Sequence, residues 1–243
     1  MQHIRCEPPG IFADVLRRHA IAMETVELDE GDKLPDWRDW DLVVVMGGPM
    51  GVNDEAEHPW LAAEKSWIAA AVRAGVPYFG VCLGAQLLAA SLGAQVRTGE
   101  ASEVGVLPVS LTAAGRADPV LSALGDEFPA LQWHGDTFGI PAGAVRLGRS
   151  PAYPNQAMRF GDAAYAVQFH VEVTDRMLAE WQQVPAYQKS AEAVLGRSGF
   201  ESLASAFAAA RDSMARSASL MFTGWLDRAG STASGQPGAC TRL

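Results

Sequence analysis

The sequence predicts an α/β protein with a mostly parallel central sheet flanked by helices, followed by a C-terminal helical extension. Three observations lead to this class: apolar strand-like runs alternate with helical patterns in the N-terminal part, short strands separated by turns follow, and helical periodicity comes last. Strand–helix–strand–helix order is typical of parallel strands joined by crossover helices. A chain of 243 residues is long enough for one large domain with an extension.

The N-terminal part contains two strand–helix units. The run D-L-V-V-V-M at 41–46 is apolar and β-branched, which predicts a strand buried on both faces. Apolar residues at helical spacing predict a helix over 61–75, with Gly75 as its C-terminal stop. The run V-P-Y-F-G-V at 76–81 repeats the strand pattern, and A-Q-L-L-A-A-S-L-G at 85–93 repeats the helical one.

The rest of the chain has a different pattern. Glycine and proline turns separate short strand candidates at 104–111, 130–136, 145–150 and 165–173. From Thr174 the pattern is helical, and one apolar face contains Phe200, Leu203, Phe207, Met214, Met221 and Trp225. We expect this face to pack on its own domain, with a dimer or partner surface as the alternative. The predicted organisation is a main domain at 1–185, a helical extension at 186–228 and a flexible tail at 229–243.

Composition limits the function classes. The formal net charge is -9 and the sequence pI is about 5.0, so the protein repels phosphate backbones and we expect no nucleic-acid partner. Cys6, Cys82 and Cys240 are too few and too widely spaced for a disulfide framework or a zinc site. No leader and no apolar run of roughly 20 residues is found. We therefore expect a cytoplasmic protein without a membrane partner.

Cys82 lies in the run G-V-C-L-G, between an expected strand and an expected helix. The spacing of Gly80 and Gly84 around it matches the G-x-S-x-G nucleophile elbow of hydrolases, with sulfur in place of oxygen. Such a turn strains the backbone at the nucleophile and leaves no room for side chains two residues away. It also brings the thiol to a helix N-terminus, which favours the thiolate. Alone, the pattern leaves open a small buried cysteine.

A thiol nucleophile needs a base and a group that orients the base, and the run Q-F-H-V-E supplies both. If 165–173 is a strand, His170 and Glu172 project to the same face, because side chains alternate along a strand. The alternative is a structural histidine beside a solvated glutamate. Together with the elbow, the pattern favours a relay from Cys82 to His170 to Glu172.

Gly47, Gly48 and Pro49 form a side-chain-poor turn directly after the first strand. Ligand sites in open α/β sheets gather at the carboxyl ends of strands. Glycine lets a backbone N–H approach a substrate carbonyl closely, as an oxyanion donor must. The alternative is a plain turn at a strand exit, and the phosphate-loop pattern G-x-x-x-x-G-K-[ST] is absent.

The G-G-P loop, the G-V-C-L-G-A-Q elbow and the late H-V-E, in this order, resemble the class I (triad) glutamine amidotransferase family. Within that family the chain is most similar to stand-alone proteins related to the amidotransferase half of GMP synthase. The resemblance covers about the first three quarters of the chain and implies a flavodoxin-like fold. It also implies hydrolysis of the glutamine γ-carboxamide through a cysteine thioester, with ammonia released for an acceptor and no metal or organic cofactor.

The resemblance implies a role for each matching residue. Cys82 would attack the amide carbon, His170 would transfer protons and Glu172 would orient the imidazole. The backbone N–H groups of Gly48 and Leu83 would form the oxyanion hole. The implied substrate-binding residues are Gly47, Gln86, Trp133, His134, Gly135 and Asp136.

Three residues depart from the family pattern. Val171 stands where the family usually has proline, and Ala85 replaces a commonly larger residue beside the elbow. Trp133 stands where the family usually has asparagine or serine, and this departure bears on the recognition of free glutamine. About seventy residues of helix and tail follow the motifs, too few for an ATP-dependent synthetase domain, so we expect the acceptor enzyme to be a separate protein. The alternatives are a hydrolase acting on another γ-glutamyl compound and a catalytically idle relative that binds a partner or metabolite.

Overall fold

The computed structural model describes residues 1–233. In this part of the chain one seven-stranded sheet has the order β1-β2-β7-β6-β5-β3-β4. The strands are β1 (Val43–Val45), β2 (Tyr78–Val81), β3 (Val96–Leu111), β4 (Glu127–Phe138), β5 (Ala144–Arg149), β6 (Ala157–Phe160) and β7 (Ala164–Val167). The tail predicted at 229–243 lies outside the described residues from 234 onward.

The sheet has a parallel part and an antiparallel part. β1, β2 and β7 are parallel neighbours, with Val44 opposite Phe79 and Phe79 opposite Tyr165. Beyond β7 the neighbouring strands of the described chain are antiparallel. The connections from β5 to β6 and from β6 to β7 are short and contain no crossover helix. The parallel region is therefore narrower than the sequence suggested, but it is the region whose carboxyl edge carries Cys82.

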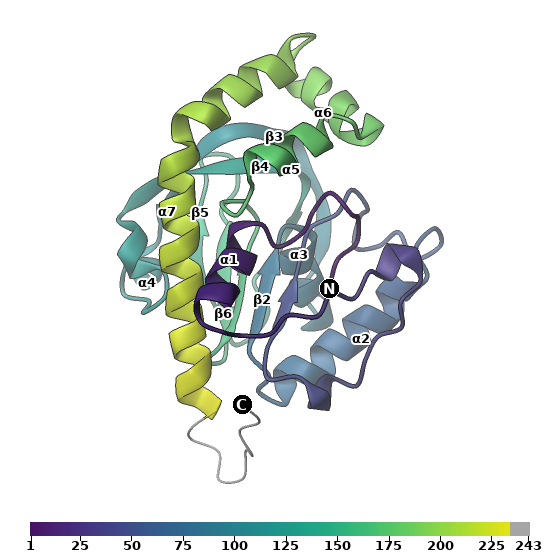
Figure 1. Ribbon diagram of the computed structural model, residues 1–243, viewed down its shortest axis with the longest axis vertical. Helices are drawn as coiled ribbons and strands as arrows, with labels where there is room; N and C mark the ends of the chain where they lie inside the picture. The colour runs from purple at the N-terminus through teal and green to yellow at the C-terminus, as the bar shows by residue number, and fades with distance from the viewer. Residues whose placement is uncertain (234–243) are drawn as a thin grey trace.

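Helices cover both faces of the sheet (Figure 1). The α-helices are α1 (Ile11–Arg18), α2 (Trp60–Arg73), α3 (Leu83–Ser91), α4 (Ala113–Arg116), α5 (Asp175–Trp181), α6 (Pro185–Leu195) and α7 (Gly199–Ala233). Short 3-10 helices occur at η1 (Leu28–Glu30), η2 (Trp37–Asp39) and η3 (Ser122–Leu124). Side chains of α1 and α7 share one hydrophobic core with β2, whereas α2 and α3 build a second core on the other face.

The long helix α7 packs on its own chain, as the apolar face predicted. The ring of Phe222 stacks on Phe12 of α1 at 4.5 Å between centroids, and it meets Phe79 of β2 edge to face at 5.3 Å. Trp225 is fully buried and its indole N–H donates to the carbonyl of Ala163 at 2.9 Å. The helix continues to Ala233, so the start of the predicted tail is helical.

Strand bounds differ from the sequence prediction most clearly at β3, β7 and β6. β3 begins at Val96, well before the expected start at Val104. β7 ends at Val167, although a strand was expected through 173. The chain leaves β2 there and forms a single antiparallel bridge between His170 and Leu131 of β4, with N···O distances of 2.8 and 2.9 Å in the two directions. The strand β6 was not expected, because its residues A-M-R-F are few and are not strongly β-forming.

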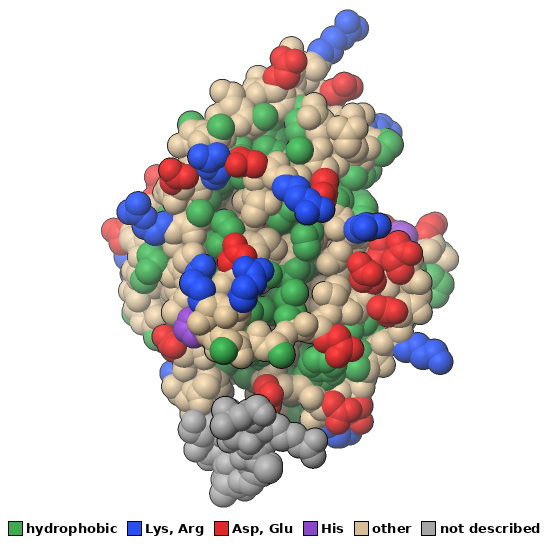
Figure 2. All heavy atoms as spheres, in the orientation of Figure 1, with side chains coloured by type: hydrophobic (Ala, Val, Ile, Leu, Met, Phe, Trp, Pro, Cys, Tyr) green, Lys and Arg blue, Asp and Glu red, His purple; other side chains and the backbone are tan. Residues whose placement is uncertain are grey.

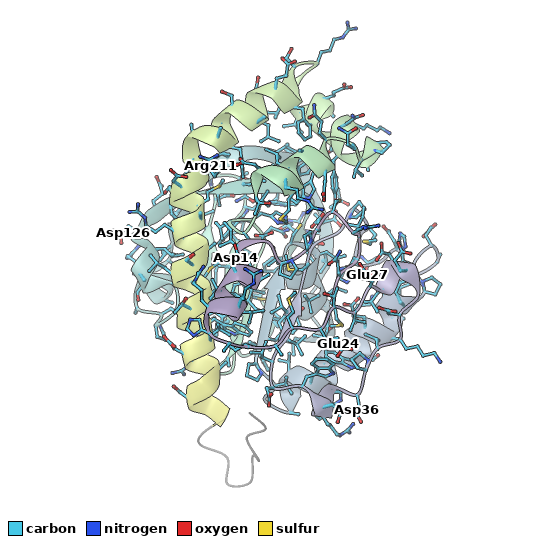
Figure 3. All side chains as sticks on the ribbon, viewed as in Figure 1. Asp14, Glu24, Glu27, Asp36, Asp126 and Arg211 are labelled. Carbon is cyan, nitrogen blue, oxygen red and sulfur yellow. The ribbon has the colours of Figure 1, made fainter. Side chains whose placement is uncertain are left out.

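The surface carries charges of both signs over the face in Figure 2. Acidic side chains gather over the segment between α1 and β1, where Figure 3 labels Glu24, Glu27 and Asp36. Figure 3 also labels Arg211 on α7, whose guanidinium contacts Asp175 at the start of α5 at 3.0 Å. Among the described residues, no helix is long and apolar enough to cross a membrane.

Candidate active site

Cys82 lies at the junction of β2 and α3 in a strained conformation. Its φ is 52° and its ψ is −105°, and within residues 1–233 only Ala20 is another non-glycine residue with positive φ. A non-glycine residue in this region costs free energy and is held by its surroundings. The backbone N–H of Cys82 still bonds to the carbonyl of Val167 at 2.8 Å, and its carbonyl accepts from Gln86 in the first turn of α3.

Gly80 and Gly84 are required by close backbone contacts, as the steric argument predicted. A methyl group on Gly80 would lie 2.6 Å from the carbonyl oxygen of Gly84. A methyl group on Gly84 would lie 2.2 Å from the carbonyl oxygen of Val45 on β1. Because both obstacles are backbone atoms, no side-chain adjustment could relieve them. The two glycines therefore allow α3 to begin directly against β1 and β2.

His170 and Glu172 are hydrogen-bonded, although the strand that was expected to align them is absent. Nδ1 of His170 lies 2.7 Å from Oε1 of Glu172, and Oε2 accepts from the backbone N–H of Val171 at 3.0 Å. Both side chains are 1% exposed. Since Nδ1 faces Glu172, Nε2 is the ring nitrogen that remains for the thiol.

Charge and burial act in opposite directions on His170. Burial, the largest influence, lowers the pKa of His170, whereas the charge of Glu172 and hydrogen bonds to Cys82 and Glu172 raise it. The outcome is a pKa well above the usual 6.5. A buried imidazole between a thiol and a carboxylate is therefore arranged to hold a proton taken from sulfur.

Cys82 opens onto a pocket of about 420 Å³. The walls come from the G-G-P loop, the start of α3, the strands β3 and β4, and α6. The predicted site residues in these walls are Gly48, Cys82, Leu83, Gln86, Trp133, His134, Gly135 and Asp136. Ala186, Tyr187 and Ser190, which belong to the predicted helical extension, also line the pocket, so α6 is part of the candidate site.

The G-G-P loop is fixed from behind by buried polar groups. A methyl group on Gly48 would lie 3.3 Å from the side chain of Leu83, so the two residues predicted to supply the oxyanion donors are neighbours. The carbonyl of Gly47 accepts from His3, whose other ring nitrogen contacts Glu64 at 3.0 Å. Gly47 itself does not line the pocket but lies behind it, against His170.

Gln86 reaches the thiol through a second glutamine. Its side-chain amide donates to Oε1 of Gln168 at 3.1 Å, and the amide of Gln168 lies 3.5 Å from Sγ of Cys82. Gln168 is 1% exposed and was not singled out from the sequence. The sequence feature that could have identified Gln168 is its position two residues before His170 in the run Q-F-H-V-E. This position puts both side chains at the carboxyl end of β7.

The predicted substrate loop is held rigidly. Nδ1 of His134 contacts the carbonyl of Asp136 at 2.8 Å and Nε2 contacts the carboxylate of Glu103 at 3.1 Å, which makes His134 a structural residue of the pocket wall. The indole N–H of Trp133 donates to Ser190 of α6 at 2.7 Å. Trp133 thus links β4 to α6 beside Cys82.

Aromatic rings shield His170 from solvent. Trp181 of α5 meets the imidazole nearly edge to face, with 5.1 Å between centroids. Trp133 and Tyr187 each lie 5.5 Å from the ring of Trp181. This aromatic cluster (Trp133, Trp181 and Tyr187) lowers the local dielectric around the imidazole and strengthens its interaction with Glu172. Within residues 1–233 no group of three or more His, Cys, Asp or Glu side chains is arranged to hold a metal ion.

Comparison with known proteins agrees with these features. The family model "Glutamine amidotransferase class-I" matches residues 12–179. The YfeJ glutamine amidotransferase-like protein of Salmonella typhimurium is 35% identical over 148 residues, covering 59% of this chain and 62% of that protein. One component of the glutamine-hydrolysing GMP synthase of Sulfolobus acidocaldarius, named as a subunit of that enzyme, is 31% identical, covering 63% of this chain and 78% of that component. The chain thus spans less than two thirds of the YfeJ protein.

Solved structures show the same fold. A glutamine amidotransferase from Methylobacillus flagellatus has a TM-score of 0.81 at 28% identity, over 93% of this chain and 92% of that one. A glutamine amidotransferase from Thermotoga maritima has a TM-score of 0.79 at 30% identity, over 92% of this chain and 95% of that one. The matched family model spans more than half of the residues, and the chain belongs to the class-I glutamine amidotransferase family.

Proposed function

We propose that the protein hydrolyses the γ-carboxamide of glutamine through a thioester on Cys82 and releases ammonia to an acceptor on a separate protein. The observation that carries this proposal is the strained Cys82 at the pocket floor, with the hydrogen-bonded His170–Glu172 pair behind it. Membership of the class-I glutamine amidotransferase family supports the same chemistry.

The reaction begins with the transfer of the Cys82 proton to Nε2 of His170, and the sulfur attacks the amide carbon. The backbone N–H groups of Gly48 and Leu83 stabilise the oxyanion. Leu83 is the first residue of α3, and the first N–H groups of a helix have no partner within it. The His170 imidazolium then protonates the leaving nitrogen, and ammonia departs. His170 next removes a proton from water, and hydroxide attack on the thioester yields glutamate and restores the thiol.

The substrate's α-amino and α-carboxylate groups would bind in the wall opposite the elbow. Asp136 and Gly135 line this wall, and Asp54 contributes a second carboxylate to the pocket. Carboxylates attract an ammonium group, whereas backbone N–H groups of the glycine-containing loop can donate to the substrate carboxylate. Gln86 and Gln168 would hold the γ-glutamyl segment close to the sulfur.

The acceptor is proposed from the relatives. The Sulfolobus acidocaldarius protein is named as one subunit of a GMP synthase, which implies a further component in that enzyme. By analogy, we expect this chain to supply ammonia to a separate synthetase or other acceptor enzyme. The formation of a stable complex would be measured by gel filtration of the chain mixed with the protein encoded beside it.

The test is the release of glutamate and ammonia from glutamine by the full chain, alone and with the neighbouring gene product. Cys82→Ala is the matched control and should release neither product. Incubation with 6-diazo-5-oxo-norleucine, followed by peptide mass mapping, should label Cys82 in the wild type. Folded wild-type protein that neither releases glutamate in either condition nor takes up the label would overturn the proposal in favour of an idle binding relative.

A second candidate is hydrolysis of a γ-glutamyl compound other than glutamine. The observation that favours it is the pocket of about 420 Å³, whose walls include Trp133 and α6 and also Thr98 and Ser102 of β3. A panel of γ-glutamyl peptides and amides, assayed beside glutamine, separates the two. Fast turnover of glutamine with no cleavage of the panel rejects this candidate.

A further inference from the structure

Glu7 is a buried carboxylate behind the proposed active site, in the segment that precedes α1. It is 4% exposed. Oε1 accepts a hydrogen bond from the hydroxyl of Tyr187 on α6, whereas Oε2 is buried and has no hydrogen-bond partner among the described residues. A buried, half-satisfied carboxylate is costly and normally requires a nearby positive charge. The candidate for that charge is His170.

Gly47 brings Glu7 and His170 together. A methyl group on Gly47 would lie 2.1 Å from Oε2 of Glu7 and 3.3 Å from Cε1 of His170. The carboxylate oxygen and the imidazole therefore both approach the position that a side chain on Gly47 would occupy, and the absence of that side chain leaves room for both. The Cε1 edge lies between the two ring nitrogens and carries part of the positive charge of an imidazolium. A carboxylate here stabilises the protonated ring through space, without a hydrogen bond.

Several titratable groups surround this carboxylate. Those on its own segment are His3 and Cys6, and those on other elements are Tyr187, His170 and Glu172. Burial, the largest influence, raises the pKa of Glu7, whereas the charge of His170 and the Tyr187 hydrogen bond lower it and Glu172 raises it. The two groups thus act on each other, and a positive charge on His170 favours a negative charge on Glu7.

We propose that Glu7 is a second carboxylate of the active centre, a positioning residue that stabilises the imidazolium of His170 and is itself held by Tyr187. The proposal rests on the proposed role of His170 as the base for Cys82. Glu172 fixes Nδ1 of the ring, and Glu7 adds negative charge on the Cε1 side. The effect is greatest when the ring is protonated, because only the imidazolium carries a full positive charge.

Tyr187 connects this second carboxylate to the substrate pocket. Its ring lines the pocket, and its hydroxyl donates to Glu7. Ser190, one turn further along α6, accepts from Trp133 and donates to the carbonyl of Tyr187 at 3.0 Å. A shift of α6 would therefore move the Tyr187 hydroxyl and change the carboxylate that supports the base. The position of α6 and the basicity of His170 are linked through one hydrogen bond.

The experiment compares the full-length wild type with Glu7→Gln and Glu7→Asp. The measurements are the pH profile of Cys82 alkylation by iodoacetamide and the kcat and KM for glutamine. We expect Glu7→Gln to shift the limb of the alkylation profile that depends on His170 to lower pH, by about one pH unit. We expect kcat to fall about tenfold while KM changes less than twofold. Glu7→Asp keeps the charge and should restore most of both properties.

Tyr187→Phe provides a second, milder variant that keeps the pocket wall. It should reproduce part of the Glu7→Gln shift and add little to it in the double variant, because both changes act on one interaction. The matched control is Tyr165→Phe. Tyr165 is also a buried tyrosine that donates to a buried carboxylate, Asp118, at 3.1 Å, but neither residue lines the pocket. The alkylation profile of Tyr165→Phe should be that of the wild type.

The alkylation profile separates the two proposals. If the wild type does not hydrolyse glutamine but Glu7→Gln still shifts the profile, the proposed function fails and the inference about Glu7 stands. If glutamine is hydrolysed and neither the profile nor kcat changes in Glu7→Gln, the inference is overturned and the proposed function stands. An equal shift in Tyr165→Phe would also overturn it, since the effect would then not be specific to this site.

Discussion

At the scale of single residues, the elbow depends on Gly84 more than on any contact of Cys82. A methyl group there would lie 2.2 Å from the carbonyl oxygen of Val45, so Gly84→Ala must push α3 away from β1. We expect a loss of about 1–3 kcal/mol in the free energy of unfolding and a large loss of Cys82 reactivity. Thermal unfolding and iodoacetamide labelling measure both. Gly139→Ala is the control, because its nearest neighbour would be 3.6 Å away.

The His170–Glu172 pair makes stability depend on pH. The pKa of His170 is raised in the folded protein above its unfolded value of about 6.5. The stabilisation is therefore fully present below about pH 6.5 and is lost as the pH rises through the folded pKa. Glu172→Gln removes this contribution and leaves a buried imidazolium without its partner, which costs about 3 kcal/mol.

Urea unfolding of the wild type and Glu172→Gln at about pH 6 and about pH 9 tests this sign. We expect the difference in the free energy of unfolding to be larger at the lower pH. The same substitution should lower kcat for glutamine about a hundredfold or more, because the base loses its orientation. A stability difference that grows with pH would contradict the raised pKa of His170.

At the scale of elements, α7 is bound to the sheet by its buried aromatic residues. Trp225 packs on Phe79 at 5.3 Å between ring centroids and on Phe222 at 5.1 Å, and it is fully buried. We expect Trp225→Ala to destabilise the protein by about 3–5 kcal/mol, through lost burial and an unfilled cavity. Leu220→Ala, on the same helix but 44% exposed, should change stability by no more than about 0.5 kcal/mol. Urea unfolding compares the two.

The elements also show what the sequence could and could not predict. The β1–α2–β2–α3 order and the elbow followed from local patterns, because a buried strand and a helix start have signatures within a few residues. The end of β7 did not, because after Val167 the chain leaves β2 and His170 pairs with Leu131 of β4, which is distant in sequence. His170 and Glu172 still meet, since their hydrogen bond depends on local backbone near Val171 rather than on strand alternation.

The candidate site also contains residues that local patterns identify and residues that only contacts distant in sequence bring together. Cys82, His170, Glu172 and Gly48 belong to motifs that can be recognised in a short window. Glu7 and Tyr187 do not, because they are 180 residues apart and meet only through the packing of α6 against the N-terminal segment. Contacts of this kind leave no periodic pattern, so side chains that support a catalytic group from a distant element need a structure to be found.

At the scale of the whole molecule, the predicted boundary between a main domain and a helical extension does not coincide with a boundary in packing. One hydrophobic core contains Phe12 and Phe79 from the N-terminal half together with Trp181, Phe207 and Trp225 from the C-terminal part. The site is joined in the same way, since α6 closes the pocket above Cys82. The family model matches residues 12–179, and described residues beyond that range, such as Trp225 and Tyr187, take part in the core and in the pocket.

This shared core predicts that the described part of the chain unfolds in one cooperative step. Tryptophan fluorescence, which reports buried rings such as Trp181 and Trp225, and far-ultraviolet circular dichroism should give the same urea midpoint. A chain truncated before Glu201 lacks nearly all of α7 and exposes the sheet face that α7 covers, so we expect it to be insoluble or to lose its sharp transition. A soluble truncated chain with a sharp transition would show that α7 is an appendage rather than part of the core.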